Sequence, residues 1–329
     1  MSTLYEILSP DFLLRQALVG SVLVGLVCPL VGVYFVLRRM IFLGVALPQL
    51  SAAGIACSFF VYRVWVGPHQ HFDLTERGVA MIGSFTFTLV GLLVLAAFER
   101  YKETVEARIG ITYAAAAAAT ILFVAADPTA DAHMVSLLKG DILATTSASL
   151  GVLIGVFSLI VFLLFAFRKE FLLVSFDRDL AVVFRKRAGL WDSLLYLVIG
   201  VTISLGVITA GPLVTFGFLV VPPLTARLIT RRMLTFSLVA AGLGAATAFT
   251  GFYCAYRFDL PLGPAEVAVA SVALVAVAVV DAARRTVGSR IAHDAPLSTS
   301  TVHPASEPRM SSALTGKKQG ENAPNDQHK

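Results

Sequence analysis

The longest stretch without a charged side chain, residues 193–226, places the strongest limit on how this chain can fold. It contains 34 residues. As a single α-helix it would extend about 51 Å, far more than the membrane hydrocarbon core of about 30 Å requires. Gly211 and Pro212 lie near its middle, and this pair favours a turn over a continuous helix. The stretch therefore predicts two short membrane spans, or two half-helices, that meet at Gly211-Pro212.

Further apolar stretches are each long enough to cross a membrane once. They cover residues 17–37, 41–62, 78–98, 109–126, 143–167, 234–256 and 264–280. Only 14% of the residues are charged, against about 25% in an ordinary soluble domain. We therefore predict an all-α integral membrane protein, a polytopic helical bundle of about nine transmembrane helices with a broken-helix turn near Gly211-Pro212.

The composition changes near the C-terminus. Residues 1–288 form the predicted transmembrane domain, whereas residues 289–329 are rich in Ser, Thr, Pro, Asn and charged residues and contain almost no large apolar side chains. Such a segment buries too little surface to offset the entropy of ordering. It is predicted to be a disordered cytoplasmic tail.

The basic residues predict the orientation in the membrane. With the N-terminus outside and nine crossings, the inner segments as far as Arg290 carry 17 Lys and Arg residues and the outer segments carry 5. This bias agrees with the positive-inside rule, and it is lost if residues 193–226 cross only once. We expect a multi-pass protein of the inner (plasma) membrane with its C-terminus in the cytoplasm.

Residues within the spans restrict the possible chemistry. Cys28, Cys57 and Cys254 lie far apart in apolar runs and predict neither a disulfide framework nor a metal site. Glu266 lies near the outer end of the last span and is expected to reach the interface, which leaves the spans almost without carboxylates. This disfavours a secondary transporter independent of ATP or a membrane enzyme. No GxxxxGK[ST] loop is present, so any ATP hydrolysis belongs to another polypeptide.

Polar and small residues within the spans give less specific signals. Gln49 follows Pro48 in the second span, with Ser51 close by. A proline kink beside an amide is suited to lining a cavity, but a kink packed against a neighbouring helix explains it equally well. Gly151 and Gly155 form a GxxxG pattern, which predicts close helix packing.

The inner segment 168–192 combines six basic residues with many apolar ones. This pattern fits an interfacial helix that lies on anionic lipid. It equally fits a docking helix that binds a cytoplasmic partner.

Five blocks of sequence, in order, resemble the permease subunits of ATP-binding-cassette importers for zinc, manganese and iron. They are residues 36–56 (VLRRMIFLGVALPQLSAAGIA), 137–145 (LLKGDILAT), 173–181 (LVSFDRDLA), 211–228 (GPLVTFGFLVVPPLTARL) and 259–264 (DLPLGP). Each block alone is a weak signal, but their order and spacing along residues 13–283 are family-like.

The resemblance implies partners and a role for the third block. It implies a transporter subunit that is not itself an enzyme, a cytoplasmic ATPase dimer, an extracytoplasmic metal-binding protein and a second permease copy, identical or not. The ATPase-coupling candidates that match the family's cytoplasmic segment are Ser175, Phe176, Asp177, Leu180 and Ala181. The resemblance implies no permanently bound cofactor, because a divalent metal would be the transported cargo.

One departure from the family affects the expected path of the ion. The family's second helix carries an acidic residue after a glycine and a histidine four positions later, whereas this chain has Val45 and Gln49. Val45, Pro48, Gln49 and Ser51 remain the candidates for the translocation path. An apolar side chain and an amide are poor zinc ligands, so the same machinery with a non-metal or altered cargo is an alternative.

Histidines and acidic residues outside the spans offer another place for a metal. His69 and His71 lie in the first outer loop, and Asp131 and His133 lie in the second. These four are candidates for an outer-face metal site if the loops meet. Solvated loop residues, or a surface that receives the binding protein, are the alternatives.

Overall fold

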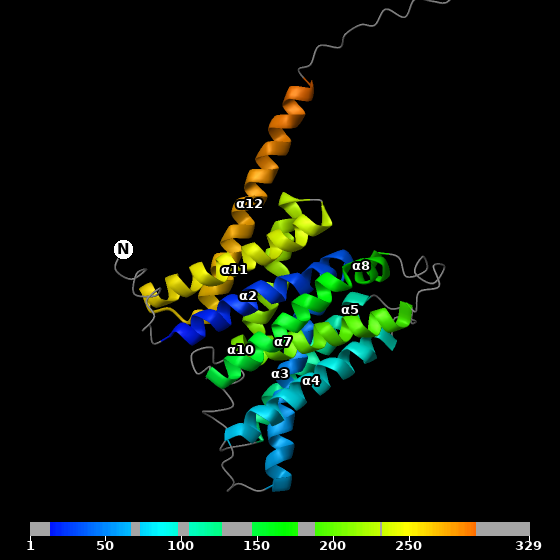
Figure 1. Ribbon diagram of the computed structural model, residues 1–329, viewed down its shortest axis with the longest axis vertical. Coiled ribbons are helices and arrows are strands. Elements are labelled where there is room, and N and C mark those ends of the chain that lie inside the picture. The colour runs from blue at the N-terminus through cyan, green and yellow to red at the C-terminus, as the bar shows by residue number, and fades with distance from the viewer. Residues whose placement is uncertain are drawn as a thin grey trace, which may run out of the picture. The chain divides into compact units, whose positions relative to one another are not determined.

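The computed structural model describes residues 14–66, 73–97, 105–126, 147–176, 188–230 and 232–293. Within these ranges the regular elements are α-helices (Figure 1). They are α2 (Arg15–Leu37), α3 (Leu43–Val66), α4 (Asp73–Ala97), α5 (Val105–Ala125), α7 (Ser147–Ala166), α8 (Arg168–Phe176), α10 (Ala188–Ile229), α11 (Met233–Phe258) and α12 (Leu262–His293). Contacts divide the chain into two units, Met1–Arg285 and Thr286–Lys329. The prediction of an all-α fold is confirmed.

Eight of the described helices are long and apolar enough to cross a membrane. The apolar part of α10, Gly189–Ile229, has 41 residues, whereas the other seven candidate spans have 18 to 26. A helix of 41 residues would be about 62 Å long, roughly twice the thickness of the hydrocarbon core. If α10 crosses twice, the described helices make nine crossings.

α10 breaks at the predicted position. Gly211 has φ 84° and ψ 165°, a conformation outside the helical region that glycine adopts without a steric penalty. A Cβ built on Gly206 would lie 2.9 Å from the Cγ2 atom of Thr215. In a straight helix these residues would be about 14 Å apart along the axis. The chain therefore bends back at Gly211, which brings Thr215 beside Gly206.

α2 is the most enclosed of the candidate spans. Of its apolar segment 72% is buried, against 17% for those of α5 and α12. Val24, Val31 and Phe35 have almost no exposed surface and belong to the main hydrophobic core. α2 packs against α3, α7, α8, α10 and α11. It therefore lies at the centre of the described bundle.

Glycines allow the spans to approach closely, as is usual in membrane bundles. A Cβ on Gly32 of α2 would clash with the carbonyl oxygen of Leu219 in α10, and one on Gly244 of α11 would clash with that of Gly25. By contrast, Gly151 and Gly155 are exposed, and among the described residues no atom apart from the nearby backbone of the same helix lies within 4 Å of a Cβ built at either. The prediction of close packing at Gly151 and Gly155 is therefore wrong for the described part of the chain.

Candidate functional site

The first turns of α3 hold the candidates for the translocation path. Val45 and Gln49 are both partly exposed and lie one helical turn apart, on the same face of α3. Pro48 is buried between them and has no N–H, so the carbonyl of Gly44 lacks its usual helical donor. Among the described residues Gln49 has no side-chain hydrogen-bond partner. This face therefore offers one free amide, whereas the carbonyl without its helical donor belongs to Gly44, which is buried.

Ser51 lies on a different part of α3. Its hydroxyl is fully buried and is 2.5 Å from the hydroxyl of Ser84 on α4. Ser51 follows Gln49 by two residues, or about 200° around the helix, so it cannot share the face of Val45 and Gln49. The structure groups Val45 with Gln49 and places Ser51 in the contact between α3 and α4.

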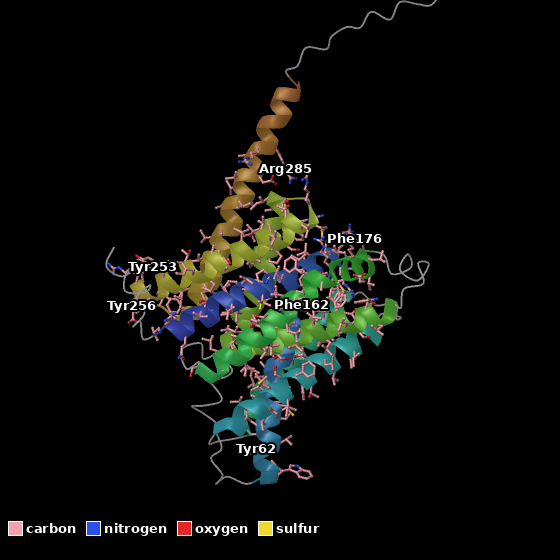
Figure 2. All side chains as sticks on the ribbon, viewed as in Figure 1. Tyr62, Phe162, Phe176, Tyr253, Tyr256 and Arg285 are labelled. Atoms are coloured by element: carbon pink, nitrogen blue, oxygen red, sulfur yellow. The ribbon has the colours of Figure 1, made fainter. Side chains whose placement is uncertain are left out.

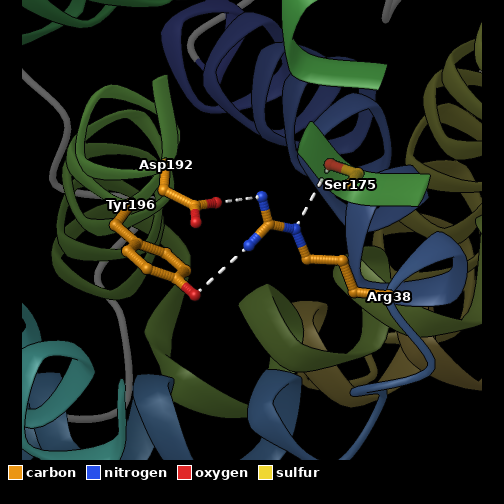
Figure 3. A network of polar contacts seen from close by, with 4 residues as sticks. All are labelled: Arg38, Ser175, Asp192 and Tyr196. Carbon is orange, nitrogen blue, oxygen red and sulfur yellow. Dashed lines mark hydrogen bonds and ion pairs between the residues drawn. The ribbon is translucent and has the colours of Figure 1, made fainter. Parts of the chain in front are cut away.

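A buried arginine joins three helices at one end of the bundle (Figure 3). The guanidinium of Arg38, directly after α2, donates to the Oδ1 atom of Asp192 at 2.6 Å and to the hydroxyl of Tyr196 at 3.2 Å, both on α10. Its Nε donates to the hydroxyl of Ser175 on α8 at 3.2 Å. The side chains of Arg38 and Asp192 are only 9% and 11% exposed. We call these four residues the Arg38 cluster.

The backbone at the end of α2 directs Arg38 inward. Arg39 has φ 56°, a left-handed conformation that ends the helix and that is uncommon for a residue other than glycine. The N–H of Met40 bonds to the carbonyl of Phe35, and that of Arg39 to the carbonyl of Val36, in the pattern of a Schellman motif. The two adjacent arginines therefore have different roles, because Arg39 is exposed while Arg38 is enclosed by α8 and α10.

α8 is held against the bundle by aromatic contacts. Phe171 is fully buried, and its ring centroid lies 6.1 Å from that of Tyr34 and 6.0 Å from that of Trp191. Phe176, at the end of α8, is instead 64% exposed (Figure 2). One face of α8 is therefore fixed to α2 and α10, and an aromatic side chain at its end is free to contact another molecule.

No group of three His, Cys, Asp or Glu side chains that could hold a metal occurs within the described residues. The outer-face candidates His69, His71, Asp131 and His133 lie outside those residues. The coupling candidates Asp177, Leu180 and Ala181 also lie outside them, while Ser175 and Phe176 lie within.

Comparisons with known proteins identify the family. Residues 11–281, more than four fifths of the chain, match the ABC 3 transport family. The chain belongs to this family. Its resemblance to ATP-binding-cassette permeases, inferred from five blocks of sequence, is confirmed.

Relatives and a solved structure agree with membership of the ABC 3 family. The chain is 30% identical to the uncharacterized membrane protein slr2045 of Synechocystis over 79% of this chain and 88% of that protein. It is 28% identical to the manganese transport system membrane protein MntC of Listeria innocua, over 79% of this chain and 87% of that protein. PsaBC from Streptococcus pneumoniae, solved in complex with Fab, has the same fold, with a TM-score of 0.70 at 22% identity over 84% of this chain and 94% of that chain.

One carboxylate in this ABC 3 family chain is placed differently from the sequence-based expectation. Glu266, near the start of α12, is fully buried and does not reach the interface. Its Oε1 accepts a hydrogen bond of 2.5 Å from the hydroxyl of Ser21 on α2, while its Oε2 has no partner within the described residues. A Cβ on Gly251 of α11 would clash with the Cα of Glu266, so α11 packs directly against this residue. The expectation was wrong because distance from a helix end does not reveal which side faces the bundle.

Proposed function

We propose that this ABC 3 family chain is the permease subunit of an importer that carries a divalent metal ion, such as manganese, zinc or iron, into the cytoplasm. The observation that supports this most strongly is the family match along residues 11–281, together with a relative named for manganese transport that aligns over most of both chains. The metal in this proposal is cargo that passes through the subunit, and no resident cofactor is required.

In this proposal a dimer of separate ATPase subunits docks on α8 and the segment that follows it. Ser175, Phe176, Asp177, Leu180 and Ala181 are the proposed contacts. The exposed ring of Phe176 supports this, because aromatic anchors frequently dominate the energy of protein interfaces. The Arg38 cluster supports the transmission of movement from the ATPase to the bundle, since it connects Ser175 on α8 to the end of α2 and the start of α10. A push on α8 would therefore move helices of the bundle as rigid bodies.

The remaining parts of the proposed assembly follow from the expected orientation. The Arg38 cluster and α8 lie at the end assigned to the cytoplasm by the excess of basic residues, and Gly211 lies at the opposite end. An extracytoplasmic metal-binding protein would deliver the ion at that opposite end. The outer-face candidates His69, His71, Asp131 and His133 would belong to this receiving surface. A second permease copy would complete the path.

The proposed path passes the face of α3 that carries Val45 and Gln49. The amide oxygen of Gln49 is an oxygen donor, which suits manganese better than zinc. Weak binding by so few donors is compatible with transport, because an ion held tightly would not leave. The alternative is the same machinery with a non-metal cargo, since Val45 supplies no ligand.

A measurement of ATPase activity distinguishes these two cargoes. We expect the purified permease–ATPase complex in lipid nanodiscs to hydrolyse ATP several times faster when its binding protein is added loaded with manganese or zinc. The same protein without metal is the control, and it should stimulate less. If no metal-loaded form stimulates hydrolysis and an organic cargo does, the metal proposal is wrong and the alternative holds.

A further inference from the structure

A pocket of about 260 Å³ lies between α2, the end of α7, the start of α8 and the start of α11. Most of its wall is apolar, with contributions from Tyr34, Phe165, Leu172 and Leu234. Arg168 and Lys169 of α8 also line it. Its volume is slightly below the range of about 300–1,000 Å³ that is typical of small-molecule pockets. It can therefore hold part of an acyl chain but not a whole lipid.

The position of the pocket along the helices corresponds to one membrane surface. Its lining residues on α2 are 30, 33 and 34, close to the end of that helix at Leu37. Those on α7 are 164 and 165, directly before its end at Ala166, and those on α11 begin at Met233, its first residue. Residue 30 lies about 10 Å from the end of α2. The pocket thus extends from the interfacial region about 10 Å into the expected hydrocarbon layer.

The faces beside the pocket are suited to lipid. Phe162 on α7 (Figure 2) is 65% exposed. It lies three residues before Phe165, or about one helical turn. Leu238 on α11 lies one turn from Leu234 and is also largely exposed. In a membrane-spanning bundle such exposed apolar faces are compatible with hydrocarbon. The pocket is therefore bordered by surfaces on which acyl chains can lie.

The two cations distinguish this pocket from a purely apolar groove. Neither Arg168 nor Lys169 has an acidic partner within the part of the chain that the structure describes. The adjoining segment 177–187 carries two acidic and four basic residues, so its net charge does not neutralise them. A guanidinium and an ammonium group beside an apolar pocket complement a phosphate that is attached to an acyl chain.

We propose that this pocket binds an anionic phospholipid of the cytoplasmic leaflet. Arg168 and Lys169 bind the headgroup phosphate, and part of one acyl chain enters the apolar pocket beside Tyr34, Phe165 and Leu172. Tyr34 also contacts Phe171 of α8. The bound lipid therefore braces α8 against α2. This proposal does not depend on the identity of the transported cargo.

A second copy of the chain is a less suitable occupant. A permease interface at this pocket would bury Arg168 and Lys169 of each copy in largely apolar surroundings. Unpaired charges in such surroundings are destabilising, whereas a lipid phosphate neutralises them. The charges therefore favour lipid over a symmetric contact between copies.

The test compares lipids and variants of the purified permease in detergent. Phosphatidylglycerol and phosphatidylcholine with the same acyl chains are titrated while the melting temperature is measured and bound lipid is counted by native mass spectrometry. We expect phosphatidylglycerol to bind the unaltered protein at least tenfold more tightly than phosphatidylcholine. Arg168→Gln with Lys169→Gln should remove most of that preference. The matched control, Arg284→Gln with Arg285→Gln, removes two exposed cations of α12 and should retain it.

Four results would overturn the proposal. One is equal binding of the two lipids to the unaltered protein, a measurement that does not depend on any variant folding. Another is an equal loss of preference in both double variants, which would show a general effect of surface charge. The third is a change from dimer to monomer in Arg168→Gln with Lys169→Gln without a change in bound lipid, which would identify a second copy as the occupant. Glycerol phosphate, which lacks acyl chains, should give no stabilisation, and stabilisation by it would contradict the role of the apolar pocket.

Discussion

Arg38→Ala is expected to reduce metal uptake by the assembled transporter at least tenfold. The change removes the buried ion pair with Asp192 and the hydrogen bonds to Tyr196 and to Ser175 on α8. Breaking a buried ion pair from one side typically costs about 3–5 kcal/mol, so the yield of folded protein should also fall. Uptake per complex and the yield of monodisperse protein are the two measurements.

Two further variants separate the effect of the Arg38 cluster on transport from its effect on the stability of the fold. Arg38→Met with Asp192→Leu removes both charges, and apolar replacement of a buried pair is frequently neutral for stability. We expect the yield to recover while uptake stays low, because Ser175 remains without its partner. Arg39→Asn is the matched control, since Arg39 is exposed and asparagine tolerates its left-handed conformation. If the double variant recovers both yield and uptake, the Arg38 cluster is only structural.

Val45→Asp combined with Gln49→His is expected to strengthen metal binding by the purified permease at least tenfold, or about 1.4 kcal/mol. The two positions lie one turn apart on one face of α3, so a carboxylate and an imidazole there can share one ion. A new carboxylate within the membrane costs several kcal/mol without a cation. The double variant should therefore fold poorly without metal and melt at a higher temperature with manganese or zinc.

Each single variant serves as the control for this pair. Val45→Asp alone should show the loss of stability with little gain in affinity, because one ligand does not make a site. The measurements are calorimetric metal affinity and melting temperature with and without metal. If the unaltered permease already binds manganese tightly and the double variant adds nothing, the ion passes elsewhere.

Much of the fold could be predicted because membrane spans impose simple requirements. The break in α10 followed from a length that exceeds one crossing and from the Gly211-Pro212 pair, and both signals are local. The family was predictable because five weak motifs occurred in order. The face shared by Val45 and Gln49 followed from helical periodicity alone.

The contacts between distant segments could not be predicted in the same way. Arg38 and Asp192 are 154 residues apart, so nothing local indicated that the first of two adjacent arginines turns inward. Glu266 was assigned to the interface from its depth, but the side that it faces depends on how α12 packs on α2 and α11. The GxxxG pattern at Gly151 failed for the same reason, because small residues permit close packing without determining where it occurs.

The most direct test of metal import is ATP-dependent uptake of radioactive manganese into proteoliposomes that contain the permease and its ATPase. The transporter can insert into the liposome with its ATPase subunits outside or inside. In either case ATP is supplied on the side of the membrane that holds the ATPase subunits, and loaded binding protein is supplied on the opposite side. The account predicts that manganese accumulates on the ATPase side only when both are present. Accumulation without ATP, or ATP hydrolysis driven by a non-metal cargo with no movement of any divalent metal, would contradict it.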